Sequence, residues 1–158
     1  MNIVLSISKK IGLLFIFLLF IQIGFTQKNT TMTYLDHIAQ YVNNLAISTA
    51  FYTNILGLDS IPEPFHDGKH TWLQIGVHSQ LHLISGADSE MVHNKNNHLC
   101  FTLADFDAFI EKLSKNNIEF ENWAGEKQAI TTRPDGIHQI WFRDPDGYWI
   151  EVNDGYKL

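Results

Sequence analysis

The chain has 158 residues and a formal net charge of −6, with 11 Lys and Arg against 17 Asp and Glu. This acidic balance argues against nucleic acid or anionic membranes as partners. The single cysteine, Cys100, excludes an internal disulfide. Since there is no low-complexity tract or Pro/Gly-rich linker, we expect one compact domain.

The N-terminal segment is typical of a secretory signal peptide. Lys9 and Lys10 precede an uncharged apolar run at residues 11–25, and Gly24 and Thr26 offer small residues for cleavage. This pattern predicts a signal peptide at residues 1–26 and export to the periplasm or the extracellular space. Because the run is only slightly shorter than a membrane span, an uncleaved anchor in the inner membrane is the alternative. It would be the protein's only membrane contact.

The first half of the remaining chain predicts a strand, a helix and three strands. After a strand at 33–42, Asn44 is a candidate N-cap for a helix at 45–56 that Gly57 ends. Short strand-like runs follow at residues 59–65, 70–76 and 79–85.

The second half repeats this order. A strand at 98–103 precedes Asp105, which is expected to cap a helix whose apolar residues have helical spacing. Further strands are predicted at 118–123, 138–143 and 148–153. Placing His98 on His37 also places Asp105 on Asn44, which indicates an internal duplication. We therefore predict an α+β domain at 33–155 made of two βαβββ modules, 33–85 and 97–153, whose sheets curve into a cup with the helices outside.

A tight turn and a strand near the C-terminus carry the most distinctive signal. Asp144-Pro-Asp-Gly147 has the residues of a chain reversal, and Glu151 follows in the middle of a strand with bulky neighbours. A carboxylate in such a strand is costly to desolvate without a cation or donors. It therefore requires partners elsewhere in the chain.

Three histidines can supply those partners. His37 and His98 lie on the first strands of the two modules, and His82 and Glu151 lie on the last strands. Neutral nitrogen and anionic oxygen donors on rigid strands suit a first-row divalent ion. We predict that His37, His82, His98 and Glu151 hold one divalent transition metal, which could be Zn, Ni, Mn, Co or Fe(II).

Glu151 and His82 are also the predicted catalytic residues. Glu151 could stay a ligand or detach as a general base, and His82 could ligate or shuttle a proton. Arg133 could clamp an anionic substrate or lie solvated in its loop. The other histidines are expected to be solvated: His66, His70, His78, His93 and His138.

The sequence resembles the vicinal oxygen chelate superfamily, the glyoxalase I, bleomycin resistance and extradiol dioxygenase group. The resemblance rests on residues 35–38, 51–52, 56–58, 97–99 and 142–151. It implies paired βαβββ modules around a metal cup, often completed by dimerisation, with ligands at His37, His82, His98 and Glu151. A His, His, Glu set matching His37, His98 and Glu151 is similar to that of fosfomycin-thiol transferases and extradiol dioxygenases. Glyoxalase I-like enzymes have a carboxylate where His82 stands.

These features predict an exported, metal-dependent, glyoxalase-like enzyme. Its substrate would be a small molecule with vicinal oxygens, chelated by the metal while an enediolate or oxyanion is stabilised. The reaction class could be that of an isomerase, lyase, hydrolase or dioxygenase. The alternative is a metal-free, drug-sequestering protein of the bleomycin resistance type. Either could act as a homodimer, because packing within one chain and swapping between two chains bring the same residue types together.

Overall fold

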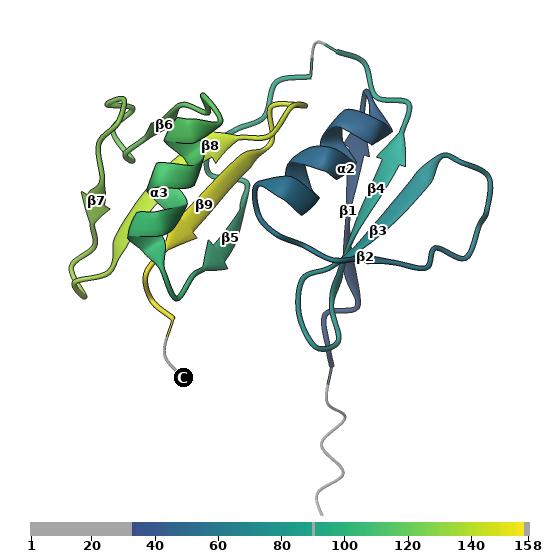
Figure 1. The fold of residues 1–158 in the computed structure, drawn as a ribbon, viewed down its shortest axis with the longest axis horizontal. Coiled ribbons are helices and arrows are strands. Elements are labelled where there is room, and N and C mark those ends of the chain that lie inside the picture. Colours follow the sequence, from purple (N-terminus) through teal and green to yellow (C-terminus); the bar gives the residue numbers. More distant parts are fainter. Residues whose placement is uncertain (1–32, 90, 157–158) are drawn as a thin grey trace, which may run out of the picture. The chain divides into compact units, whose positions relative to one another are not determined.

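The computed structural model describes residues 33–89 and 91–156. The predicted signal peptide at 1–26 lies outside these residues. Within the described ranges, no helix is both long enough and apolar enough to cross a membrane. The strands form two separate sheets, each accompanied by one helix (Figure 1).

The first module has the predicted βαβββ order. Its elements are β1 (His37–Val42), α2 (Leu45–Asn54), β2 (Ser60–Ile61), β3 (His70–Gln74) and β4 (Gln80–Ser85). The sheet order is β1-β4-β3-β2, and β1 runs parallel to β4. The predicted cap is confirmed, because the Asn44 side chain accepts a hydrogen bond from the Ile47 amide at 3.2 Å. β2 is shorter than predicted since Pro62 and Pro64 follow it and cannot donate to a strand ladder.

The second module repeats the order with one addition. Its elements are β5 (His98–Thr102), α3 (Phe106–Lys115), β6 (Phe120–Glu121), β7 (Thr131–Thr132), β8 (His138–Arg143) and β9 (Trp149–Asn153). The sheet order is β5-β9-β8-β6, and β7 pairs with His138 and Gln139 at the N-terminal end of β8. Asp105 caps α3 by accepting from the Ala108 amide at 3.0 Å, as predicted. Only the two-residue β7 was not predicted, and the α+β class with two βαβββ modules is confirmed.

The strand registers make the duplication visible in three dimensions. His82 pairs with Ala39 on β1, and Glu151 pairs with Cys100 on β5, so His82 and Glu151 occupy equivalent positions. Their strand neighbours Leu81, Leu83, Ile150 and Val152 are fully buried in the hydrophobic core. His82 and Glu151 therefore lie on the sheet faces opposite the core, as their alternation with apolar residues predicts.

The Asp144–Gly147 turn joins the two modules. The buried Tyr52 hydroxyl on α2 donates to Asp144 Oδ2 at 2.8 Å, and Asp146 Oδ1 accepts from the Asn43 amide at 2.6 Å. Gly147 has φ +85°, which the turn requires and which L side chains rarely adopt. The described residues from Tyr34 onward form one compact unit.

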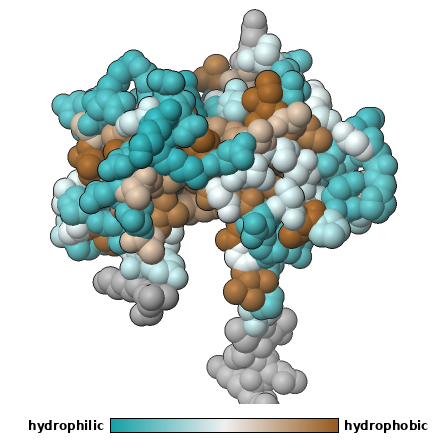
Figure 2. Space-filling model, in the orientation of Figure 1, coloured by the Kyte–Doolittle hydropathy of each residue, from teal (hydrophilic) through white to brown (hydrophobic). Residues whose placement is uncertain are grey.

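Hydrophobic residues also reach the surface. Figure 2 shows brown, hydrophobic areas between hydrophilic ones on the face in view. Exposed large apolar side chains include Tyr41 on the edge strand β1, which is 47% exposed, and Phe65 in the loop before β3, which is 54% exposed. Single exposed side chains of this kind are normal on a protein surface.

Candidate metal centre

Glu151 and His98 form a pair on the second sheet. The Glu151 side chain is buried, and its Oε2 lies 3.1 Å from His98 Nε2. Its Oε1 accepts from the Cys100 thiol and from Asn153 Nδ2, both at 3.2 Å. Partial burial of the thiol and the neighbouring carboxylate raise the pKa of Cys100 to about 12, so the thiol remains a donor at neutral pH. The partners that the Glu151 strand position requires are thus present.

The tautomer of His98 favours a cation at this pair. His98 Nδ1 lies 2.8 Å from the Lys95 carbonyl, which can only accept, so Nδ1 carries the hydrogen. A neutral imidazole then turns its Nε2 lone pair towards the Glu151 carboxylate. Two acceptors at 3.1 Å repel each other unless a proton or a metal ion lies between them. The donor set of the second module therefore fits a divalent metal ion.

The first sheet carries the other half of the predicted set. His37 Nδ1 lies 2.6 Å from Asp36 Oδ2, so Nδ1 donates and the lone pair of a neutral imidazole lies on Nε2. The rings of His37 and His82 are 5.8 Å apart between centroids, and Trp72 stacks on His82 at 4.2 Å. Burial, followed by the neighbouring imidazoles of His70 and His37, lowers the pKa of His82. His82 is thus held mainly neutral at physiological pH.

His70 is a site residue that the sequence analysis missed. Its Nδ1 lies 2.8 Å from His82 Nε2, and its Nε2 lies 3.5 Å from Asp67 Oδ2. The expectation that His70 is solvated is therefore wrong. The β3–β4 register pairs Trp72 with His82, which places His70 diagonally beside His82 on the same face. A hairpin register read from the sequence could have indicated this contact.

The remaining histidines divide by environment. His66, His78 and His138 are exposed, as expected. His93 is half-buried instead, with its ring 3.7 Å from that of Tyr148 between centroids. Its position in the connector between the modules gave no indication of this stacking.

Lys95 is a second residue that sequence reasoning did not identify. Its ammonium lies 2.7 Å from Glu121 Oε1 and 4.9–5.6 Å from the ring centroids of Trp123, Trp141 and Trp149. The side chain is 16% exposed. Lys95 therefore anchors the connector between the modules on the Glu151 side of the sheet, where its carbonyl orients His98.

Two tryptophans next to the predicted ligands have unused donors. Trp72 pairs with His82, and Trp141 pairs with Glu151, so the two indoles are also equivalent. Both indole N–H groups are buried without a hydrogen-bond partner among the described residues. Buried donors of this kind are rare in folded proteins and are often met by a ligand or water.

The two ligand pairs are not brought together within the described chain. In residues 33–89 and 91–156, no group of three or more His, Cys, Asp and Glu side chains is arranged to hold one metal ion. His37 and His82 belong to one sheet, and His98 and Glu151 belong to the other. β1 and β5, which carry His37 and His98, are the edge strands of their sheets.

Arg133 does not act as a free clamp. Its guanidinium lies 2.6 Å from Asp135 Oδ2 in the same loop. The solvated alternative describes it better, since its side chain is 40% exposed.

The fold, the equivalent His82 and Glu151 positions and the His98–Glu151 pair together define a glyoxalase-like domain. The sequence profile of the Glyoxalase/Bleomycin resistance protein/Dioxygenase superfamily matches residues 34–152, and the chain belongs to this superfamily. The predicted resemblance is thereby confirmed.

Individual relatives are distant. Glyoxylase I 4 of Arabidopsis thaliana is 26% identical over 128 residues, which cover 77% of this chain and 70% of that protein. The uncharacterised protein YaeR of Escherichia coli (strain K12) is 28% identical over 127 residues, covering 73% and 92%.

Solved structures share the fold. Oxidase ChaP-H2 superposes with a TM-score of 0.66 at 19% identity, covering 79% of this chain and 95% of that one. The fosfomycin resistance protein FosX from Listeria monocytogenes superposes with a TM-score of 0.63 at 22% identity, with the same coverage of 79% and 95%.

Proposed function

We propose that the protein is an exported, metal-dependent enzyme of this superfamily that acts on a small substrate with vicinal oxygens. One divalent transition metal would be held by His37, His98 and Glu151, with His82 as a fourth ligand or as an acid–base group. The observation that carries the proposal is the His98–Glu151 pair, whose Nε2 and Oε2 face each other at 3.1 Å, with Glu151 on a buried strand. Because His98 Nδ1 already donates to the Lys95 carbonyl, this arrangement requires a proton or a metal ion between the two atoms.

The chain's own residues supply acid–base chemistry beside this site. When bound, the metal would stabilise the negative charge that develops on two neighbouring substrate oxygens. His82 Nε2 lies 2.8 Å from His70 Nδ1. The other ring nitrogen of His70, Nε2, lies 3.5 Å from Oδ2 of Asp67, which is exposed. This order of side chains supports a proton path between His82 and solvent.

We further propose that a homodimer completes the site. The His37–His82 pair and the His98–Glu151 pair lie on different sheets, and β1 and β5 are the edge strands of those sheets. Association of two copies through these edges would bring one pair from each chain to a shared ion. Analytical ultracentrifugation with and without metal tests this arrangement.

Export is part of the proposal, and it rests on the N-terminal sequence pattern alone. Intact-mass measurement of the protein recovered from the periplasm or the medium tests it. Loss of residues 1–26 would support a cleaved signal, and an uncleaved chain in the membrane fraction would support the anchor instead.

Metal analysis is the decisive test of the enzyme proposal. Residues 27–158, purified without chelator, should retain roughly one equivalent of a transition metal per chain. His37→Ala and His98→Ala should each abolish retention, whereas His138→Ala should not, because His138 is an exposed residue paired with Asp154. A metal content unchanged in His98→Ala would contradict the proposed ligand set.

A metal-free, small-molecule-binding protein is the second candidate. The aromatic surroundings of His82 favour it: Trp72 stacks on the imidazole at 4.2 Å, and the exposed Phe65 lies parallel to it at 6.0 Å. No retained metal after incubation with Zn, Ni, Mn, Co and anaerobic Fe(II) would support this candidate over the enzyme.

A further inference from the structure

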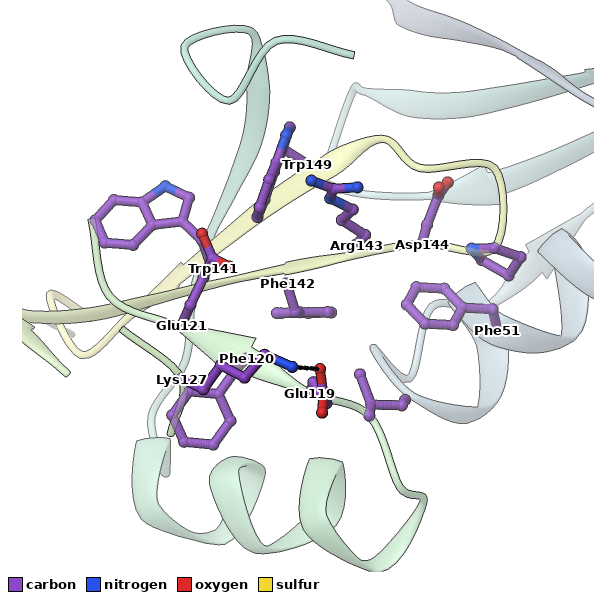
Figure 3. A pocket seen from close by; sticks show the side chains of 12 residues that line it. Phe51, Glu119, Phe120, Glu121, Lys127, Trp141, Phe142, Arg143, Asp144 and Trp149 are labelled. Carbon is purple, nitrogen blue, oxygen red and sulfur yellow. Dashed lines mark hydrogen bonds and ion pairs between the residues drawn. The ribbon is translucent and has the colours of Figure 1, made fainter. Parts of the chain in front are cut away.

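An open pocket of about 560 Å³ lies at the edge of the second sheet (Figure 3). β6 pairs with β8 only at Phe120–Phe142 and Glu121–Trp141, so Arg143 and the residues after it extend beyond the last pair. Where β8 extends beyond β6, side chains from both faces of β8 line the pocket. Arg143 and Trp141 come from the face that carries Glu151, and Phe142 comes from the core face.

One part of this pocket is aromatic. Phe51 of α2 and Phe142 of β8 contact each other with ring centroids 6.3 Å apart, and Phe120 of β6 also lines the pocket. Figure 3 shows Phe142 and Phe51 on one side of β8, with Arg143 and Trp149 on the other. Phe142 and Phe120 are almost wholly buried, whereas Phe51 is half-buried. A flat apolar group in the pocket could therefore contact Phe51 while a polar group on it reaches Arg143.

The charges that line the pocket leave one cation unpaired. Glu119 is paired with Lys127 at 2.8 Å, and Glu121 is paired with Lys95 at 2.7 Å. Asp144 Oδ2 accepts from Tyr52. Arg143 is exposed, and no carboxylate lies within ion-pair distance of it in residues 33–89 and 91–156.

The Arg143 guanidinium is nevertheless held in place. Its Cζ lies 4.3 Å from the centroid of the Trp149 ring, which is buried and donates its indole N–H to the His93 carbonyl at 3.2 Å. Stacking on an aromatic face fixes the plane of a guanidinium while its N–H edges remain free to bind. A planar, bidentate acceptor such as a carboxylate matches those edges.

We propose that this pocket binds a small aromatic carboxylate, with the carboxylate on Arg143 and the ring against Phe51, the one partly exposed aromatic ring among the lining residues. The volume lies in the usual range for small-molecule sites. None of the four proposed metal ligands lines the pocket, so binding there can be tested on protein stripped of metal.

The test compares 1-naphthoate with its neutral amide by isothermal titration calorimetry on the purified full chain in EDTA. We expect saturable binding of naphthoate, and binding of the amide weaker by about tenfold or more, as expected for the loss of a charge-assisted pair. Arg143→Gln should weaken naphthoate binding by a similar factor. Arg133→Gln is the matched control and should change it less than about twofold, since Arg133 is already paired with Asp135.

Three results would overturn the proposal: no saturable naphthoate binding, equal binding of the acid and the amide, or unchanged binding in Arg143→Gln. Inorganic phosphate binding as tightly as naphthoate would overturn the aromatic part. The indole ¹⁵N–¹H resonance of Trp149 provides a second readout, because it should shift on naphthoate addition in the wild type and not in Arg143→Gln. Thermal unfolding of both variants checks that they remain folded. Loss of metal retention leaves these outcomes unaffected, so the two proposals can fail separately.

Discussion

The hydroxyl of Tyr52 is expected to be worth much more to stability than an ordinary surface hydroxyl. Tyr52 is fully buried, and its hydroxyl is the only donor to Asp144 Oδ2 within residues 33–89 and 91–156, whereas Oδ1 accepts from the amides of Asp146 and Tyr148. Tyr52→Phe removes that donor and leaves a buried carboxylate oxygen unmet. A hydrogen bond to a charged group contributes about 1.5–3 kcal/mol, so we expect a loss of that size in the free energy of unfolding at pH 8.

The loss should depend on pH in a defined direction. Burial raises the pKa of Asp144 to about 6, and the hydrogen bond from Tyr52 opposes that rise. Without the hydroxyl, the folded-state pKa of Asp144 should rise further above its unfolded value. Ionisation of the carboxyl should then cost the variant more stability than it costs the wild type. The destabilisation by Tyr52→Phe should therefore be larger at pH 8 than at pH 5.

Urea unfolding of the wild type and Tyr52→Phe at the two pH values measures both effects. Tyr148→Phe is the matched control, because its hydroxyl bonds only to the backbone of the exposed Tyr41. It should cost no more than about 1 kcal/mol at either pH. A destabilisation by Tyr52→Phe that is below about 0.5 kcal/mol, or equal at pH 5 and pH 8, would refute the reasoning.

Three further predictions concern the same chain. Because the folded-state pKa of Asp144 lies near 6, above its ordinary value of 3.8, wild-type stability should fall by about 2 kcal/mol between pH 4 and pH 7 through this group. Asp144→Asn should lack this fall in urea titrations, and a wild-type curve that rises would contradict the assignment. Lys95→Met removes the ammonium that anchors the connector whose Lys95 carbonyl orients His98, so it should lower metal affinity about tenfold in competition with a chelating dye. Lys127→Met should leave that affinity unchanged, because Lys127 pairs with the exposed Glu119. Glu151→Gln should abolish metal retention in elemental analysis, and retained metal would remove Glu151 from the ligand set.

Local patterns predicted the fold well. Asn44 and Asp105 cap their helices as expected, because a cap depends on a side chain and a backbone amide three residues away. The strand predicted at 59–65 is only two residues long, since Pro62 and Pro64 cannot donate to a strand ladder. β7 was missed because a two-residue strand depends on its partner β8 rather than on its own residues.

The candidate site was predicted only in part. His37, His82, His98 and Glu151 were placed on the correct sheet faces, because strand alternation and the repeat determine those faces. His70 and Lys95 were not identified, since each contacts the site through a hairpin register or a connector that the sequence pattern does not specify.

The sequence by itself determined the two βαβββ modules, the capped helices and the turn at Asp144. These features follow from periodicity and from contacts between residues close in the chain. Only the tertiary structure decided which of the two arginines, Arg133 or Arg143, has no carboxylate partner among the described residues. Arg133 meets Asp135 within its own loop, whereas Arg143 stacks on Trp149 from the next strand. Charge pairing depends on distances between side chains on separate strands, and folding alone sets those distances.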